Sequence, residues 1–397
     1  MTQSAGPGRS RPRVYLDHAA TTPMVPEAVA AMTAELTRVG NASALHGSGR
    51  AARRVVEDCR ELIAARVGAR PVELIFTSGG TESDNLAVKG AYWSRRDRDR
   101  RRVVISVLEH HAVLDSAAWL AAADGAELDL IGVDGTGRLD LAAAEALVDP
   151  RTAVVSVMAG NNEVGTLQPV AEVAALAARA GAVSHSDAVQ AVGHVPVDFA
   201  ASGLDLMTFT GHKLGGPYGV GALLARRETA LTSVQHGGGQ ERDVRSGTLD
   251  VAAVAGFAAA VEVAVTGLAV EETRVRALRA ELVAAVTAAV PGVTLHGSTD
   301  AACSLPGVTN LGFADCAADS VLMLLDAAGI DCSAGSACSA GVSSPSHVLT
   351  AMGVGEADAR SALRFSLGHT STSADVRALV AALPEAVARA RAAAAFV

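Results

Sequence analysis

The chain has 397 residues, half of them hydrophobic, and a formal net charge of -9 at pH 7. This length can bury a large core and suggests two domains, and this hydrophobic content argues against intrinsic disorder. The arginines are interspersed with acids and form no basic stripe. We therefore expect small-molecule or protein ligands and no direct contact with nucleic acid.

Two segments bear on the location of the protein. Residues 1 to 13 lack the apolar run of a signal peptide, so we interpret them as a flexible tail and expect a cytoplasmic protein. Residues 251 to 270 (VAAVAGFAAAVEVAVTGLAV) are long enough to span a bilayer, but they carry Glu262 near the middle. A central acid costs about 2.5 to 3.5 kcal/mol on insertion scales. We therefore predict a buried helix here and no membrane association.

Short apolar runs alternate with longer stretches of helical period. This alternation predicts an α/β fold with a mainly parallel sheet covered by helices on both faces. In such a sheet ligands bind at the carboxyl ends of the strands, and polar clusters follow most of these runs. The runs are ELIFT (73 to 77), VVISV (103 to 107), AVVSVM (153 to 158), GAVSH (181 to 185), LMTFT (206 to 210) and VGALLA (220 to 225).

The pattern changes in the last third of the chain. We predict a large domain over residues 14 to 263 and a smaller α+β domain over residues 264 to 397. The smaller domain is predicted to contain helices at 273 to 290, 319 to 329 and 373 to 395, the last with Pro384 inside, and strands within 291 to 297 and at 308 to 313.

The chain contains only two lysines, and Lys213 lies in TGHKLGGPYG (210 to 219), just after a predicted strand. Basic positions elsewhere are arginine, which cannot form a Schiff base with an aldehyde as a deprotonated lysine can. Pyridoxal phosphate is the commonest cofactor of this kind, so we predict that Lys213 binds it. The other lysine, Lys89, lies on a predicted helix, and we interpret it as solvated.

A pyridoxal phosphate site also needs a phosphate cradle and an anion for the pyridine nitrogen. Residues 78 to 81 (SGGT) follow a strand and precede a helix, so their backbone N–H groups can face a phosphate. Asp187 in HSDAVQ lies at the end of a short strand, and its carboxylate would keep the pyridine nitrogen protonated. Taken alone, each feature is also typical of a plain turn or a helix cap.

Together these motifs resemble the NifS/IscS-type cysteine desulfurases of the pyridoxal-phosphate-dependent class V aminotransferase family. The resemblance covers nearly the whole chain from residue 14 and implies a fold type I enzyme with a large domain built on a mainly parallel seven-stranded sheet. The matching motifs are YLDHAATTP (15 to 23), GNASALHGSGR (40 to 50), FTSGGTESDN (76 to 85), EHHAVLD (109 to 115), NNEVG (161 to 165), HSDAVQ (185 to 190), GHK (211 to 213), HGGGQERDVRSGT (236 to 248), GSACSAG (335 to 341) and RFSLGH (364 to 369).

The resemblance implies which residues hold the cofactor ring. Lys213 would bind it as a Schiff base, and His110 would stack on the ring and handle protons. Asp187 would pair with the pyridine nitrogen, and Gln190 would hydrogen-bond the ring oxygen.

The resemblance also implies ligands for the phosphate and for the substrate. Asn162 and Arg364 would bind the substrate carboxylate, Arg364 as a two-pronged donor. The implied phosphate ligands are Gly80, Thr81, Thr210 and His212, with Thr248 reaching in from the neighbouring subunit of a homodimer.

Cys338 decides which reaction this cofactor serves. It lies in SAGSACSAGVSS (333 to 344), whose small residues predict a mobile loop and make a buried, inert cysteine improbable. We predict that its thiolate attacks the sulfur of bound L-cysteine, leaving L-alanine and a persulfide. The other four cysteines (Cys59, Cys303, Cys316 and Cys332) are interpreted as structural, and the absence of CxxC pairs predicts no metal site and no disulfide framework.

The sequence thus predicts a cysteine desulfurase that passes sulfur to acceptor proteins. The resemblance implies an iron–sulfur scaffold and a tRNA thiolation enzyme as acceptors. A selenocysteine lyase, or a desulfurase dedicated to one pathway such as DNA sulfur modification, remains an alternative. A non-catalytic scaffold is disfavoured, because Lys213, Asp187, His110 and Cys338 are all present.

Overall fold

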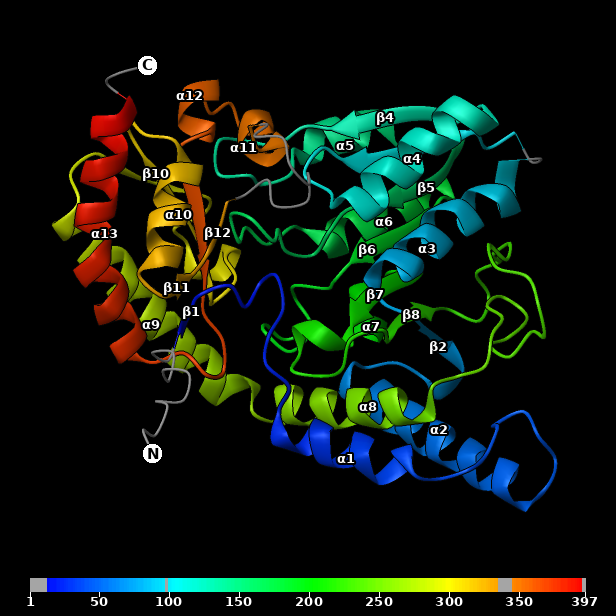
Figure 1. Cartoon of the computed structure of the whole chain (residues 1–397). Coiled ribbons are helices and arrows are strands. Elements are labelled where there is room, and N and C mark those ends of the chain that lie inside the picture. The colour runs from blue at the N-terminus through cyan, green and yellow to red at the C-terminus, as the bar shows by residue number, and fades with distance from the viewer. Residues whose placement is uncertain (1–12, 97–98, 335–344, 395–397) are drawn as a thin grey trace, which may run out of the picture.

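The computed structural model describes residues 13–96, 99–334 and 345–394. The segment that carries Cys338 and most of the predicted N-terminal tail lie outside these ranges. Two sheets with separate hydrophobic cores make up the described part of the chain (Figure 1).

The larger sheet has seven strands in the order β2-β8-β7-β6-β5-β3-β4. Every neighbouring pair is parallel except the two pairs that involve β8, so the predicted mainly parallel seven-stranded sheet is confirmed. The strands are β2 (Leu74–Thr77), β3 (Arg102–Ser106), β4 (Glu127–Ile131), β5 (Thr152–Ser156), β6 (Val183–Asp187), β7 (Leu206–Thr210) and β8 (Gly221–Ala225).

Helices cover both faces of this sheet, as the alternation of apolar runs predicts. α3 (Gly80–Arg95) and α4 (His111–Asp124) pack on one face. The other face is covered by α2 (Gly47–Arg66), α5 (Leu141–Leu147), α6 (Val170–Ala180), α7 (Phe199–Ser202) and α8 (Val251–Thr266), and α1 (Pro26–Leu36) runs beside α8.

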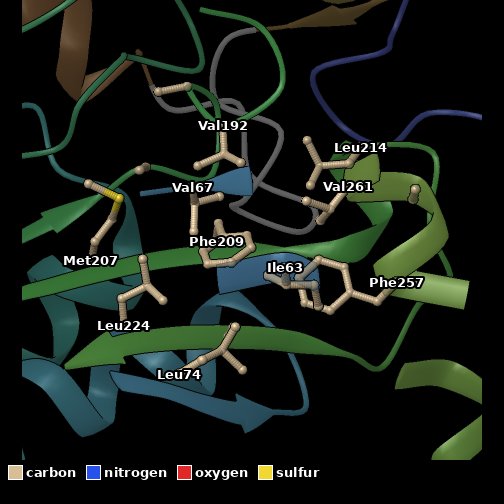
Figure 2. Close-up of a cluster of buried hydrophobic side chains, with 14 of the residues drawn as sticks. Ile63, Val67, Leu74, Val192, Met207, Phe209, Leu214, Leu224, Phe257 and Val261 are labelled. Carbon is tan, nitrogen blue, oxygen red and sulfur yellow. The ribbon is translucent and has the colours of Figure 1, made fainter. Parts of the chain in front are cut away.

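Figure 2 shows the core between this second face and α2 and α8. Phe209 of β7 and Phe257 of α8 meet there with ring centroids 5.5 Å apart. Strands such as β6, β7 and β8 are buried at all five positions. That burial explains why β7 and β8 appear in the sequence as mainly apolar runs rather than as alternating patterns, whereas β6 (VSHSD) buries polar side chains.

The smaller sheet is antiparallel, with the order β12-β13-β10-β9. Its strands are β9 (Val293–His296), β10 (Val308–Phe313), β12 (Ser333–Ala334) and β13 (Ala362–Ser366). The helices of this part of the chain are α9 (Leu268–Ala289), α10 (Ala318–Ala327), α11 (His347–Ala351), α12 (Glu356–Ala359) and α13 (Ser373–Ala394), which continues through Pro384 as predicted.

The N-terminal residues join this smaller unit. β1 (Val14–Tyr15) pairs with β11 (Ile330–Asp331), and Leu16 lies in the core under β10 and β13. Asp17 then bridges to Ser366 at the end of β13. The chain therefore enters the large unit only after residue 18, and the division at residues 263 and 264 stays a prediction.

Several elements differ from the sequence prediction, including β13 of the smaller sheet, which has no predicted counterpart. β4 is missing from the predicted strands because it lies at the edge of the sheet with mixed exposure, so its residues (ELDLI) form no continuous apolar run. The predicted helix over 251 to 270 ends at Thr266, and α9 begins after Gly267 at an angle of 72° to α8.

The burial predicted for residues 251 to 270 holds for the first of these helices. Nine residues of α8 are buried against the large sheet and α1. Within the described ranges no single helix is long and apolar enough to cross a membrane, and α8 and α9 meet that criterion only as a bent pair.

A buried ion pair fastens residues 236 to 248 to the large unit. Arg60 of α2 donates both terminal nitrogens to the two carboxylate oxygens of Glu241, at 2.7 and 2.8 Å. Glu241 is 2% exposed and also accepts the backbone N–H of Phe76 at 2.9 Å, while the Arg60 guanidinium lies 4.8 Å from the centroid of the Phe76 ring. Removing Arg60 would leave the Glu241 carboxylate buried without its cation, whereas Arg60 without Glu241 would keep its ion pair with Glu57 at 3.1 Å.

We expect Arg60→Ala to lower the free energy of unfolding by about 3 to 5 kcal/mol, because Glu241 would keep its charge without a cation. The matched control is Arg179→Ala, whose guanidinium is 62% exposed in its pair with Glu145. The control should change the free energy of unfolding by less than about 0.5 kcal/mol. Urea unfolding at one protein concentration measures both, and equal effects of the two variants would contradict the role given to the buried pair.

Candidate active site

Lys213 ends the short 3-10 turn Gly211–Lys213, which directly follows β7. Its side chain reaches back to the N-terminal segment, where Nζ donates to the carbonyl oxygens of Ala19 at 2.5 Å and Ala20 at 2.7 Å. The amine is thus held at the carboxyl edge of the large sheet by two backbone acceptors.

Asp187, the last residue of the neighbouring strand β6, lies at the same edge and is 5% exposed. Its Oδ1 accepts the backbone N–H of Val189 at 2.9 Å. Burial raises the pKa of Asp187, while this hydrogen bond and the electrostatic interactions with His110 and Lys213 oppose the rise. The predicted meeting of Asp187 with Lys213 and His110 is therefore present as a mutual electrostatic interaction.

His110 caps the N-terminus of α4, with its Nδ1 accepting the N–H of Ala112 at 3.1 Å. An acceptor nitrogen carries no proton, so the ring's exchangeable proton belongs on Nε2. Burial lowers the pKa of His110, partly offset by Asp187. The neutral ring therefore presents an N–H donor at Nε2.

The N-terminus of α3 forms a cradle of backbone N–H groups, since the first turn of a helix has no internal acceptors for them. Gly79 precedes the helix with φ of 148°, a value that favours glycine. The loop lies so close to β8 that a Cβ on Gly221 would come within 2.8 Å of Gly79 Cα. Gly80 and Thr81 begin the helix itself.

Of the other predicted phosphate ligands, Thr210 lies beside this cradle, since a Cβ on Gly79 would come within 3.7 Å of its Oγ1. Thr210 is buried at the end of β7, and its hydroxyl donates to the carbonyl of Val220 at 3.1 Å. His212 stacks on Tyr218 with ring centroids 5.8 Å apart. Burial, aided by the charge of Lys213, lowers the pKa of His212 to about 4, so the ring is neutral at pH 7.

Thr248 is exposed. Arg245, three residues before it, forms an ion pair with Glu82 of α3, with a distance of 2.8 Å from Nε to Oε1. Glu82 also accepts the N–H of Ser78 at 2.7 Å. Gln190, the predicted partner of the ring oxygen, is 7% exposed, and its Nε2 donates to the carbonyl of Ala19 at 2.9 Å.

Arg364 on β13 joins the smaller unit to the site and is 4% exposed. One terminal nitrogen donates to the backbone carbonyl of Asn162 at 3.0 Å, and the other to Asp17 Oδ1 at 2.8 Å. Its Nε is buried, with no hydrogen-bond partner in the part of the chain that the structure describes. Asp17 is not among the predicted site residues, although it lies in the motif YLDHAATTP.

Two further buried acids were also missed. Glu109 accepts the N–H of Met158 at 2.6 Å on one oxygen, and its other oxygen has no partner among the described residues. Asp84 Oδ1 lies 3.6 Å from Nε2 of His185. Burial and the charge of Asp187 raise the pKa of both carboxyl groups well above their usual values. Their only sequence signal is an acid inside the motifs TESDN and EHH.

The described cysteines have the packed environments expected of structural residues. Burial raises the pKa of the Cys332 thiol to about 12 and that of Cys59 to about 11. Cys316 is buried in the core of the smaller unit, and Cys303 is half-buried. Cys338, the predicted nucleophile, falls outside the described residues.

These features fit pyridoxal phosphate. A helix N-terminus suits a phosphate, a buried carboxylate suits a protonated pyridine nitrogen, and a lysine amine suits an aldehyde. A parallel α/β sheet with these three groups at its carboxyl edge defines a fold type I enzyme that depends on pyridoxal phosphate. Residues 14–379 match the family described as aminotransferase class-V, and the chain belongs to that family.

Named relatives agree with this assignment. The chain is 55% identical over 384 residues to an IscS-like cysteine desulfurase of Mycobacterium tuberculosis, covering 96% of this chain and 98% of the relative. Its fold matches a solved NifS-like protein with a TM-score of 0.86 at 32% identity, over 97% of this chain and all of the other. It also matches SspA solved in complex with cysteine, with a TM-score of 0.78 at 30% identity, over 89% and 98% of the two chains.

His18, beside the residues that hold Lys213, is 5% exposed and hydrogen-bonded on both ring nitrogens. Nδ1 lies 2.6 Å from Thr22 Oγ1, and Nε2 lies 3.2 Å from Ser371 Oγ. Burial, followed by the charges of His369 and His194, lowers the pKa of His18 to about 4. In the folded protein His18 is therefore neutral down to a pH far below the ordinary histidine value.

This depressed pKa predicts an acid sensitivity of folding. Between pH 6.5 and 4 the unfolded chain binds a proton at His18 that the folded chain does not, so stability falls as the pH falls. From pH 7 to pH 4 the wild-type protein should lose roughly 3 kcal/mol more unfolding free energy than His18→Gln. Urea unfolding at each pH tests this, with His236→Gln at an exposed position as the control. Parallel curves for the wild type and His18→Gln would contradict it.

Proposed function

We propose that this chain is a pyridoxal-phosphate-dependent cysteine desulfurase whose Cys338 receives the sulfur of L-cysteine. The observation that carries the proposal is the meeting of Lys213, Asp187 and His110 at one edge of the large sheet. It occurs in a chain that is 55% identical over 384 residues to an IscS-like cysteine desulfurase.

The cofactor supplies an electron sink that weakens the bonds at the carbon bearing the amino group. Lys213 would bind its aldehyde and Asp187 its pyridine nitrogen, with Gln190 at the ring oxygen. The phosphate would lie at the N-terminus of α3, with Gly80, Thr81, Thr210 and His212 as ligands and Thr248 of a neighbouring subunit.

His110 is the proposed stacking residue and proton carrier. Its Nδ1 is already engaged with the N–H of Ala112, which fixes the ring orientation at the start of α4. Because burial lowers the pKa of His110, the ring is neutral at pH 7 and carries its proton on Nε2. It would donate that proton from Nε2, and it would accept one only at Nδ1, on breaking the hydrogen bond from Ala112.

Arg364 and Asn162 are the proposed binding site for the substrate carboxylate. The buried Nε–H of Arg364 lacks an acceptor among the described residues, and an unpaired buried donor of this kind is costly. A carboxylate oxygen would satisfy it. The two terminal nitrogens are already fixed by Asn162 and Asp17, so the guanidinium plane is oriented before substrate arrives.

Cys338 is the proposed sulfur nucleophile. Its thiol and L-cysteine would react to give L-alanine and a Cys338 persulfide: the carbon–sulfur bond of the substrate breaks, and a sulfur–sulfur bond forms. A cysteine thiol is mostly protonated at neutral pH, so the site or the bound substrate must take its proton before the attack.

The persulfide must then pass its sulfur to an acceptor. We propose an iron–sulfur scaffold and a tRNA thiolation enzyme as acceptors, supported by the relative's description as IscS-like. A homodimer is proposed with them, because Thr248 is exposed where a second subunit could approach it. The cytoplasmic location stays a prediction.

The function is tested by turnover of L-cysteine with pyridoxal phosphate present. The wild type should release equal amounts of L-alanine and transferable sulfur, and mass spectrometry should find Cys338 about 32 Da heavier, the mass of the added sulfur atom in the reaction written above. Cys338→Ser should still change its visible absorbance on adding L-cysteine but form no persulfide.

Lys213→Ala provides the control for the cofactor. It should lose the visible absorbance that depends on the covalent link, while Lys89→Ala, which removes the only other lysine, should keep it. A colourless wild-type protein after reconstitution, or a Cys338→Ser variant that desulfurates at the wild-type rate, would overturn the proposal.

Arg364→Ala should weaken the apparent affinity for L-cysteine about 10- to 100-fold, as expected for a lost charge-assisted hydrogen bond. Arg364→Lys should recover only part of it, because an ammonium lacks the planar fork. Titration of the absorbance change with L-cysteine measures the affinity, with Arg377→Ala on the exposed face of α13 as the control. An affinity for Arg364→Ala equal to the wild type would remove Arg364 from the site.

A further inference from the structure

One buried carboxylate beside the site has no role in the proposed reaction. Glu163, in the turn NNEVG after β5, is 4% exposed. Its Oε2 accepts the hydroxyl of Ser346 at 2.6 Å, and Ser346 is itself 3% exposed. The two residues are 183 positions apart, so this contact fastens two distant parts of the chain to each other.

Ser346 also caps α11. Its Oγ accepts the N–H of Leu349 at 3.2 Å while its hydroxyl proton goes to Glu163. The next residue, His347, places Nε2 3.2 Å from the carbonyl oxygen of Glu109. The start of α11 is therefore attached both to the turn with Glu163 and to the residue before His110.

The turn that carries Glu163 is braced by internal hydrogen bonds and also contacts the proposed substrate-binding residue Arg364. Asn161 Oδ1 accepts the N–H groups of Glu163 and Val164, at 2.9 and 3.0 Å. The carbonyl of Asn162 accepts from Arg364 at 3.0 Å. Consecutive residues of one turn thus orient the proposed carboxylate-binding arginine and hold Ser346.

The choice of an acid at this position is costly, which argues that its hydrogen bond matters. Burial raises the pKa of Glu163 to about 7, although the Ser346 hydroxyl and the charges of Arg364 and His111 oppose the rise. An apolar residue would pack in the same space without the cost of burying a carboxyl group. An apolar residue, however, could not accept the hydrogen bond from the Ser346 hydroxyl.

We propose that Glu163 is a positioning residue for sulfur transfer: its hydrogen bond fixes Ser346 to the turn that also orients Arg364. The proposal rests on the function proposed above, in which Cys338 is the nucleophile. Cys338 precedes Ser346 by eight residues, which span at most about 28 Å when fully extended. The other end of this stretch is held by Ala334, which pairs with Leu363 of β13 and lies four residues before Cys338. A fixed Ser346 holds the second end, and releasing it widens the range of distances open between the thiol and the bound substrate.

The test separates substrate binding from sulfur transfer in the reconstituted enzyme. Glu163→Ala and Ser346→Ala should each bind L-cysteine with an affinity within about twofold of wild type by absorbance titration. Each should form the Cys338 persulfide about 10- to 100-fold more slowly in a single turnover, as expected when a reacting group is misplaced. The double variant should be no slower than the slower single variant, because both remove the same contact.

Two further variants and one measurement distinguish a general loss of folding from a loss of the Ser346 position. Glu163→Gln keeps a side-chain oxygen for Ser346 and should stay within about threefold of the wild-type rate. Glu172→Ala, at an exposed position on α6, should match the wild type. In substrate-free protein, Glu163→Ala should speed hydrogen exchange of the Leu349 amide, which Ser346 caps.

The outcomes distinguish this proposal from the one it rests on. Wild-type turnover with an unchanged persulfide rate in Glu163→Ala would overturn the positioning role alone. The same holds if the affinity for L-cysteine falls in parallel with the rate, since Glu163 would then act on substrate binding. A wild-type protein that forms no persulfide would overturn both.

Discussion

The burial of three carboxyl groups behind one sheet edge is the constraint that shapes this site. Asp84, Glu109 and Asp187 are each at most 5% exposed, and each is close enough to another for their charges to repel. Three buried negative charges cannot be sustained together in such surroundings. Burial raises the pKa of all three carboxyl groups, but only at Asp187 do neighbouring basic groups, His110 and Lys213, oppose the rise. Of the three, Asp187 is therefore best suited to carry the negative charge.

A protonated pyridine nitrogen beside Asp187 would further offset the cost of burying its carboxylate, which Lys213 offsets only in part. Lys213 is in turn held by the carbonyl oxygens of Ala19 and Ala20, and Gln190 donates to the Ala19 oxygen as well. The segment after β1 therefore positions both the lysine and the glutamine.

The same N-terminal segment explains how the two sheets act on one site. Ala19 N–H donates to Ser366 Oγ at 2.8 Å, and the Thr22 N–H donates to the carbonyl of His212 at 3.1 Å. Between these two contacts the chain passes from β13 of the smaller sheet to the turn after β7 of the larger one. Any shift of the smaller unit is thereby transmitted to the backbone that holds the Lys213 amine.

Much of this fold follows from the sequence, because most of its central strands are buried on both faces and appear as mainly apolar runs. The residues at the carboxyl ends of those strands, such as Asp187 and Lys213, could be predicted to converge for the same reason. The edge strand β4 and the break at Gly267 could not, since mixed exposure removes the apolar run and alanine-rich sequence continues across the break.

Local sequence patterns could not predict the ion pair of Arg364 with Asp17 or the contact of Glu163 with Ser346. Their partners lie 347 and 183 positions apart, and neither pair belongs to a periodic motif. Both contacts meet at the turn 161 to 165, where Asn162 and Glu163 are consecutive. A reaction in which one residue binds a carboxylate and another removes a sulfur atom requires the two to be placed relative to each other. Arg364 and Ser346 are hydrogen-bonded to adjacent residues of one turn, so few rotatable bonds separate the two contacts. Their positions relative to each other are thereby restricted.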